Sequence, residues 1–175
     1  MRPSLAVARE PLGGASGMIP LSAAWREPLF FFGTLTDLDV LAYVLGRPVD
    51  LDDLEPAALD GHRRVRALDA SYPLLLPAPF GTGAGAAVPG MLLRRASRRD
   101  IARVNHFESG EYRAELHPVR ALGDGLTRQA WLYVALEGRL AATDEPWELE
   151  AWRALHKPGF FAACDGWMAD CPEPG

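Results

Sequence analysis

The pattern of apolar and polar residues predicts a buried strand followed by a helix near the start of the chain. The run "PLFFFGTL", residues 28–35, is apolar up to its glycine, which indicates a buried strand. A helical pattern then begins at Thr36, with Asp39 at capping-box spacing, and ends at Gly46. The apolar face of this predicted helix comprises Val40, Leu41, Val44 and Leu45.

The middle of the chain predicts extended segments and a second helix. Residues 57–68 alternate in part and indicate a strand or hairpin arm with an arginine-rich exposed face. Residues 72–85 form a proline-punctuated extended stretch that ends in a flexible glycine loop, and residues 86–96 form another strand. Ser97 and Asp100 have the spacing of a second capping box, so a helix is predicted from there.

The last third predicts a hairpin and a C-terminal helix. Residues 112–122 and 127–136 alternate as two strands around a Gly-Asp-Gly turn. Residues 143–159 fit one helix, capped by Thr143 and stopped by its lysine-proline-glycine end. Because the later strands form a hairpin, the pattern favours an α+β fold with a mixed, largely antiparallel sheet over a doubly wound parallel fold.

The domain organisation follows from length and local composition. A chain of 175 residues fits one domain of ordinary size. Residues 1–26 are rich in glycine, alanine, serine and proline without periodicity, and are predicted to be a flexible leader. Residues 27–140 are predicted to be the main domain. Residues 141–175 are predicted to be a C-terminal helical extension packed on that domain.

Composition and charge exclude several classes of partner. The chain is 49% hydrophobic, carries a formal charge of −5 and has no basic block, so nucleic acid is not an expected partner. No run approaches the ~18 apolar residues of a membrane span, and no signal sequence stands out. The expected location is therefore the cytoplasm, without membrane association.

Metal and cofactor chemistry also finds no support in the sequence. The four histidines lack metal-ligand spacing, and the interval between Cys164 and Cys171 is not a zinc spacing. A serine nucleophile elbow, a Walker loop and a dinucleotide-binding glycine motif are absent. No metal or cofactor is predicted.

The first candidate for chemistry is the turn after the aromatic run. Gly33 lets the backbone turn tightly, and the amides of Thr34, Leu35 and Thr36 follow it near a helix N-terminus. Free amides and the helix dipole make such a place suited to anions, including carboxylates. The alternative is a plain strand-to-helix turn without a ligand.

The second candidate is the segment "NHFESGEY", residues 105–112. Glu108 follows Phe107, the last apolar residue of the predicted helix, and precedes a glycine stop. The negative end of the helix dipole and partial burial both disfavour its charge, which suits general acid/base work. The alternative is a solvent-facing glutamate at a fraying helix end. Glu111 is the weaker candidate because it falls in the turn.

These segments, taken in order, resemble the γ-glutamylcyclotransferase superfamily, which includes AIG2-like proteins. The family's loop after the first strand matches residues 32–35, and its tyrosine-proline segment matches Tyr72 and Pro73. Its V-x-G strand matches residues 88–90, and its glutamate-containing central motif matches residues 104–112. The resemblance covers about residues 29–136 and implies a sheet that curls into a small barrel with flanking helices.

The resemblance also implies a reaction. The family cyclises γ-glutamyl compounds to 5-oxoproline and releases an amine or amino acid, without a cofactor. By similarity Glu108 is the general acid/base. The implied substrate-binding residues are Phe32, Gly33, Thr34, Leu35, Tyr72 and Tyr112. The expected partner is a small γ-glutamyl substrate: glutathione, a γ-glutamyl dipeptide or a γ-glutamyl amine.

Three departures from the family pattern keep a second hypothesis open. Phe32 replaces the loop tyrosine, Asn105 replaces an aspartate, and Ser109 replaces a glycine. The alternative function is therefore an inactive family member that acts as a small-molecule binding or protein-interaction module. A homodimer or a protein partner would then dock through the exposed aromatics of the C-terminal segment, which are Trp147, Trp152, Phe160, Phe161 and Trp167.

Overall fold

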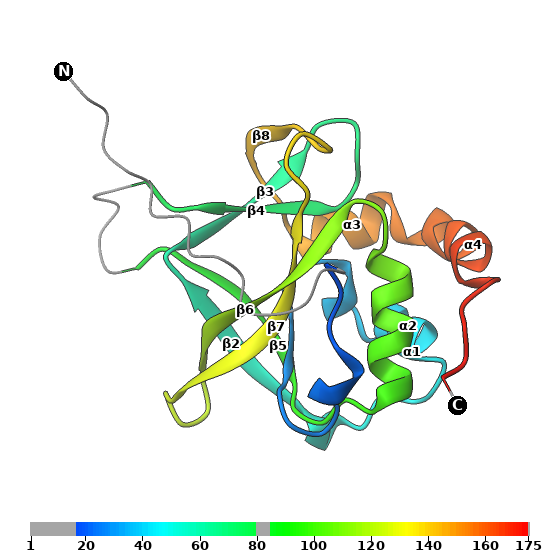
Figure 1. The fold of residues 1–175 in the computed structure, drawn as a ribbon. Helices are drawn as coiled ribbons and strands as arrows, with labels where there is room; N and C mark the ends of the chain where they lie inside the picture. The colour runs from blue at the N-terminus through cyan, green and yellow to red at the C-terminus, as the bar shows by residue number, and fades with distance from the viewer. Residues whose placement is uncertain (1–16, 80–84, 175) are drawn as a thin grey trace.

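The computed structural model describes residues 17–79 and 85–174 and contains two β-sheets beside a group of helices (Figure 1). The strands are β1 (Leu29–Phe31), β2 (Leu54–Asp60), β3 (His62–Ala67), β4 (Pro73–Pro77), β5 (Ala87–Leu93), β6 (Tyr112–Ala121), β7 (Thr127–Ala135) and β8 (Ala142–Pro146). The α-helices are α1 (Leu38–Leu45), α2 (Arg98–Glu108), α3 (Leu149–Leu155) and α4 (Lys157–Met168). Short 3-10 turns lie at Leu21–Ala23, Thr34–Thr36 and Leu51–Asp53.

Five strands close into a barrel in the order β1-β5-β2-β6-β7, and β4-β3-β8 form a separate sheet. Each pairing is antiparallel except the one between β1 and β7, which closes the barrel in parallel. The predicted α+β class with a mixed, largely antiparallel barrel is therefore confirmed. Residues 57–68, predicted as one strand or hairpin arm, instead belong to two strands, because Gly61, at φ +73°, turns the chain from β2 into the second sheet.

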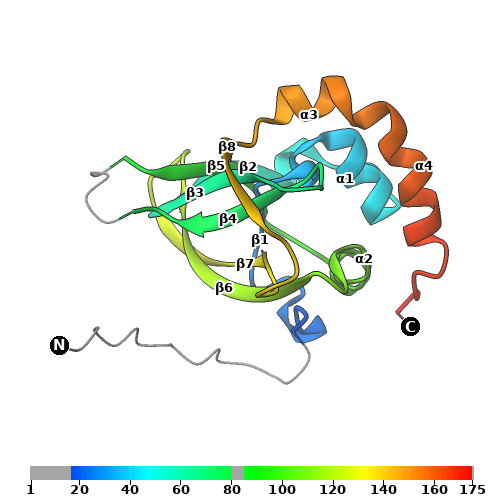
Figure 2. The ribbon, with the colours of Figure 1, turned by 90° about the horizontal axis from the view of Figure 1, so that it is seen from above.

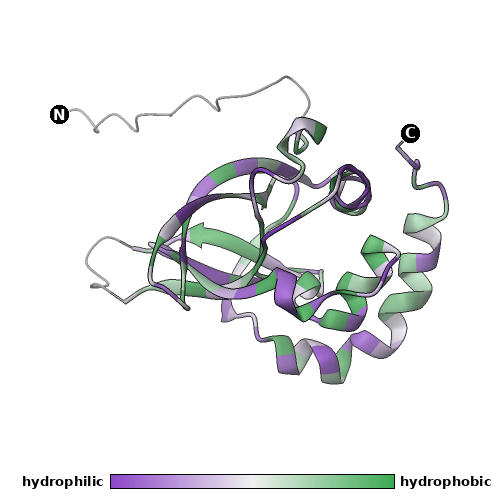
Figure 3. Cartoon of the chain, turned by 90° about the horizontal axis from the view of Figure 1, so that it is seen from below, coloured by the Kyte–Doolittle hydropathy of each residue, from purple (hydrophilic) through white to green (hydrophobic). Residues whose placement is uncertain are grey.

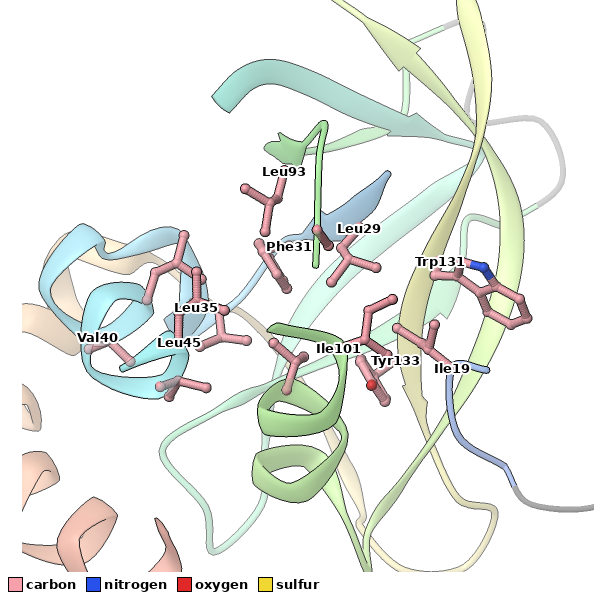
Figure 4. Packing of buried hydrophobic residues seen from close by; sticks show 14 of the residues in the cluster. Ile19, Leu29, Phe31, Leu35, Val40, Leu45, Leu93, Ile101, Trp131 and Tyr133 are labelled. Carbon is pink, nitrogen blue, oxygen red and sulfur yellow. The ribbon is translucent and has the colours of Figure 1, made fainter. Parts of the chain in front are cut away.

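The aromatic run is buried on both of its faces. Phe30 and Phe32 point into the barrel interior, where they pack with residues such as Leu92. Leu29 and Phe31 point the other way, into a core shared with α1 and α2 (Figure 4). This alternation is the period-2 geometry of a strand with no solvent-facing side, which explains why the run carries no polar residue.

The helices gather on one side of the barrel, with α3 and α4 passing outside α1 (Figure 2). The predicted apolar face of α1 is fully buried. Its predicted cap is wrong, because residues 34–36 form a 3-10 turn. Asp37 therefore becomes the N-cap and accepts the N–H groups of Asp39 and Val40. In α2 the predicted capping box of Ser97 and Asp100 is present.

Segments on both flanks of the barrel domain contact α2. Residues 17–26, expected to be part of a flexible leader, lie against it. The backbone of Ile19 donates to the Asn105 side chain and accepts from it, both at 2.9 Å. Near the C-terminus, Glu173 pairs with Arg99 and Arg103 of the same helix. Residues 1–16 and most of the predicted glycine loop, 80–84, lie outside the described residues.

The helix predicted over residues 143–159 is wrong at both ends. Residues 142–146 form β8, which pairs with β3, and the hydroxyl of Thr143 donates to the carbonyl of Arg66. The expected stop at Lys157 is instead the start of α4, where Pro158 is tolerated in the first helical turn. Long-range sheet pairing thus overrides local helix signals at Thr143.

Most of the C-terminal aromatics are buried within this chain rather than exposed for docking. Trp147, Trp152 and Phe160 are 3%, 2% and 7% exposed, whereas Trp167 is half exposed. The helices carry green hydrophobic segments as well as purple hydrophilic ones (Figure 3), as expected for helices that cover a core. Cys164 and Cys171 are both free thiols.

An ion-pair cluster fastens α3 and α4 to the start of α1. The buried carboxylate of Asp37 accepts from Arg153 at 2.7 Å and from Lys157 at 3.0 Å. Burial alone would raise the pKa of Asp37, but the hydrogen bonds from Arg153, Lys157 and the Val40 N–H outweigh it and lower the pKa. Asp37 therefore stays ionised and holds the C-terminal helices in place.

The close contact between β5 and β1 yields the first prediction. A methyl group at Gly90 would overlap the carbonyl oxygen of Phe31 and lie 2.7 Å from the Phe30 ring. We expect Gly90→Ala to lower the free energy of unfolding by about 2 kcal/mol or more, measured by urea denaturation. The control is Gly166→Ala in α4, where a methyl group meets nothing within 4 Å. Equal stability of the two variants would contradict the prediction.

The Asp37 cluster yields the second prediction. Asn retains the N-cap but loses the charge, so we expect Asp37→Asn to cost about 2 kcal/mol at neutral pH. Asp39→Asn, at a 75% exposed side chain, should change stability by less than about 0.5 kcal/mol. Because the pKa of Asp37 is lowered, its contribution is present above pH 3.8 and is lost as pH falls through the folded-state pKa. Urea melts at pH 7 and in acid test this, and a deficit that persists in acid would count against it.

Candidate active site

A cavity of about 410 Å³ opens where the turn after β1, the C-terminal end of α2 and helix α4 meet. Its lining includes residues 30–35, 72–73, 106–109, 111–112, Tyr133, Phe160 and Trp167. Every predicted site residue lies in this wall, namely Phe32, Gly33, Thr34, Leu35, Tyr72, Glu108 and Tyr112. The fold thus brings together residues that are up to 80 positions apart in the sequence, from Phe32 to Tyr112.

The turn after β1 offers two unpaired backbone donors. Within the described residues, the N–H groups of Thr34 and Leu35 have no hydrogen-bond acceptor. The third amide expected to be free, that of Thr36, instead donates to the carbonyl of Gly33 at 3.0 Å and closes the 3-10 turn. The predicted help from a helix dipole is not available, because the side chain of Asp37 occupies the N-terminus of α1. An anion at this turn would therefore be held by the two free N–H groups alone.

Neighbouring side chains fix the position of this turn. A methyl group at Gly33 would lie 2.9 Å from the ring of Pro73, so glycine is required by close packing rather than by a positive φ. Arg64 donates to the carbonyl of Phe32 at 2.6 Å, and its guanidinium lies 4.9 Å from the centre of the Trp147 ring. These contacts hold the donors rigid, which a binding turn requires.

Glu108 is the last residue of α2, and its carboxyl faces this cavity. The side chain is partly open to the cavity, but protein surrounds it, and burial raises its pKa to about 8. The carboxyl of Glu108 has no hydrogen-bond partner within residues 17–79 and 85–174. A carboxyl without a partner that stabilises its charge is suited to exchange protons with a ligand near neutral pH.

Two tyrosines stand beside this carboxyl. The hydroxyl of Tyr72 donates to Glu111 at 2.7 Å, and the rings of Tyr72 and Tyr112 make an edge contact with centroids 6.1 Å apart. Burial, followed by the Glu111 hydrogen bond, raises the pKa of Tyr72 to about 12. Burial also raises the pKa of Tyr112, so both hydroxyls remain protonated donors at neutral pH.

The family model described as gamma-glutamyl cyclotransferase, AIG2-like matches residues 29–154 of the chain. The chain belongs to this family. The match reaches beyond the predicted domain end at residue 140 and takes in β8 and most of α3. No curated protein matches the chain in sequence.

Solved structures share the AIG2-like fold at low sequence identity. The solution structure of At5g39720.1 from Arabidopsis thaliana is 21% identical with a TM-score of 0.55, covering 85% of this chain and 95% of that one. At3g28950.1 from the same plant is also 21% identical at a TM-score of 0.55, covering 82% and 84%. The crystal structure of YkqA from Bacillus subtilis is 17% identical at a TM-score of 0.50, covering 85% of this chain and 56% of YkqA.

The departures of this AIG2-like chain from the family motif have structural accounts. Asn105 both accepts from and donates to the Ile19 backbone, which a carboxylate cannot do, and it also accepts from the hydroxyl of Tyr133. Phe32 adds its ring to the barrel interior, where a tyrosine hydroxyl would need a partner. Ser109 caps α2, its hydroxyl donating to the carbonyl of His106 at 2.7 Å.

Sequence patterns gave no indication of several cavity residues. Tyr133 lines the cavity, and so do Phe160 and Trp167, which were expected to be exposed for docking. Glu111, the weaker carboxyl candidate in the sequence, contributes a second carboxylate. Phe160 and Trp167 are seven positions apart and therefore share one helix face, a signal that is readable once α4 is known to be a helix. Among the described residues no group of three or more acidic, histidine or cysteine side chains is placed to hold a metal, and no helix is long and apolar enough to cross a membrane.

The raised pKa of Glu108 yields the third prediction. Between pH 4.5 and about 8 the folded chain keeps a proton that the unfolded chain releases. Folding stability should therefore fall as pH rises through this window, by up to roughly 1.4 kcal/mol per pH unit. Glu108→Gln lacks this term, so its stability relative to the unmodified chain should grow from pH 5 to pH 8 and then level off. Urea melts across this range test the expectation, and parallel stability curves would refute it.

Proposed function

We propose that this chain is a γ-glutamyl cyclotransferase that converts a γ-glutamyl amide, peptide or amine to 5-oxoproline with release of the amine. One observation carries the proposal. The Glu108 carboxyl, whose pKa is about 8, shares a cavity with the unpaired N–H groups of Thr34 and Leu35. A proton acceptor and a pair of oxyanion donors in one cavity are what an intramolecular aminolysis needs.

In the proposed mechanism Glu108 moves one proton in each half of the reaction. Its carboxylate removes a proton from the α-ammonium, and the free amine attacks the γ-carbonyl carbon of the same molecule. The N–H groups of Thr34 and Leu35 stabilise the resulting oxyanion. As the C–N bond to the leaving group breaks, Glu108 returns its proton to the departing nitrogen, which regenerates the carboxylate. The second proton of the attacking nitrogen passes to the released amine, which leaves as an ammonium ion, and the lactam nitrogen keeps one hydrogen. A pKa near that of an α-ammonium makes both transfers feasible at neutral pH.

The other cavity residues are proposed to hold the substrate folded. Nucleophile and electrophile belong to one molecule, so a large part of the catalytic gain comes from fixing a cyclic conformer. Tyr112 supplies a protonated hydroxyl in the cavity wall, whereas the Tyr72 hydroxyl donates to Glu111 and can accept a hydrogen bond from the substrate. Phe32 and Gly33 supply an apolar part of the wall. The same N–H groups of Thr34 and Leu35 are the alternative site for the substrate carboxylate before the oxyanion forms.

The fourth prediction is the direct test of this reaction. Purified protein should release 5-oxoproline from at least one member of a panel of glutathione, γ-glutamyl dipeptides and γ-glutamyl amines. Glu108→Gln should lower the rate by roughly 10²–10⁴-fold, the usual contribution of a general acid/base. Glu137→Gln, at an exposed residue outside the cavity, is the matched control and should keep full activity.

Circular dichroism of all three proteins shows whether they are folded. If the folded wild type releases no 5-oxoproline from the whole panel, the chemistry is wrong and the function reverts to a binding or interaction module of the same fold. If Glu108→Gln retains full activity, the reaction stands but Glu108 is not its acid/base.

A further inference from the structure

The cavity wall is aromatic well beyond what a γ-glutamyl group needs. Phe107 at the end of α2 and Phe160 and Trp167 on α4 form a cluster with ring centroids 5.7–6.3 Å apart. Phe32, Tyr72 and Tyr112 also line this cavity. A glutamyl moiety is polar at both ends, so it has no use for so much ring surface. Such a wall is suited to an apolar, planar group.

The charges around the cavity also favour an apolar ligand group. Its described lining contains the carboxyls of Glu108 and Glu111 and the imidazole of His106, but no lysine or arginine. The Nε2 atom of His106 lies 2.7 Å from the Trp167 carbonyl, and the nearby Arg64 is committed to the Phe32 carbonyl and the Trp147 ring. Glu111 is held in place by Tyr72 at 2.7 Å, so its oxygens cannot easily turn away. A second carboxylate on the ligand would meet like charge with no lysine or arginine in the described lining to balance it.

The α4 side of the wall is fixed rather than loosely placed. Phe160 is 7% exposed and packs edge-on against Trp152, with centroids 5.0 Å apart. Trp167 is half exposed, and its backbone carbonyl lies 2.7 Å from Nε2 of His106. Its ring makes edge contacts with Phe107 and Phe160 and lines the cavity.

We propose that the cavity selects γ-glutamyl derivatives of bulky apolar amines, aromatic ones above all, whose leaving group carries no carboxylate. This inference rests on the proposed function and names its substrate class. It places γ-glutamyl aromatic amides ahead of glutathione and γ-glutamyl amino acids. The rings of Phe107, Phe160 and Trp167 supply the attraction, and Glu111 supplies the rejection of a second carboxylate.

The test compares one ligand, γ-glutamyl-phenethylamide, with two others that each differ from it by one group. γ-Glutamyl-phenethylamide and γ-glutamyl-phenylalanine share the ring and differ by a carboxylate, whereas γ-glutamyl-methylamide lacks both. Calorimetric titration uses the Glu108→Gln protein, which keeps a neutral side chain at this position and prevents turnover. The phenethylamide should bind at least about tenfold more tightly than either of the other two.

Second substitutions in the Glu108→Gln background separate the two causes. Trp167→Ala should reduce the preference for phenethylamide over methylamide. Glu111→Gln, which still accepts from Tyr72, should reduce the preference for phenethylamide over γ-glutamyl-phenylalanine. Leu155→Ala, at a 75% exposed residue of α3 outside the cavity, is the control and should leave both ratios unchanged.

The outcomes separate this inference from the proposed function. Equal or tighter binding of γ-glutamyl-phenylalanine or of the methylamide, or no binding of any of the three, overturns the inference. Assays of 5-oxoproline release by the wild type from the same three compounds test the chemistry independently. Release without a preference for the phenethylamide sinks the inference and leaves the reaction. Preferential binding without release sinks the reaction and supports the ligand class.

Discussion

The rest of the structure depends on the close packing of Gly90, on β5, against the Phe31 carbonyl and the Phe30 ring of β1. β1 is only three residues long, yet it closes the barrel between β5 and β7 and carries apolar side chains to both cores. A side chain at Gly90 would push β1 outward and separate these two layers. The turn that follows would move with it, because Gly33 packs on Pro73 and the Phe32 carbonyl is held by Arg64. The geometry of the cavity thus depends on Gly90, a residue that does not itself line the cavity.

Whereas the contact of Gly90 stabilises the fold, the burial of the Glu108 carboxyl destabilises it. The two fully buried carboxylates of the described residues, Asp37 and Asp100, each have a cation and N–H partners. Glu108 is desolvated without such compensation, which disfavours its charge and costs folding stability whenever it is ionised. Natural chains retain such groups where a ligand supplies the missing partner, so local instability and reactivity have the same origin here.

The sequence predicted best what depends on neighbouring residues. The capping box of Ser97, the buried face of α1 and the strand through Phe31 are local patterns, and the structure contains them. The resemblance to the γ-glutamylcyclotransferase superfamily also implied that Gly33 and Glu108 belong to one site, and the fold brings them to one cavity. Thr143 was misassigned because its segment pairs with β3, some 77 positions away. The position of α4 depends on contacts of Lys157 with residues about 120 positions earlier, which no local pattern encodes.

The contacts that converge on α2 change where the folding unit of this chain begins and ends. The family segment spans residues 29–154, but the helix that carries Glu108 is pinned from outside it on both sides. The Ile19 backbone makes two hydrogen bonds to the Asn105 side chain, and Glu173 forms ion pairs with Arg99 and Arg103. An excised family segment would therefore retain Glu108 and lose the contacts that orient its helix. For this chain, the unit needed to hold α2 in place is therefore longer than the segment that defines the family.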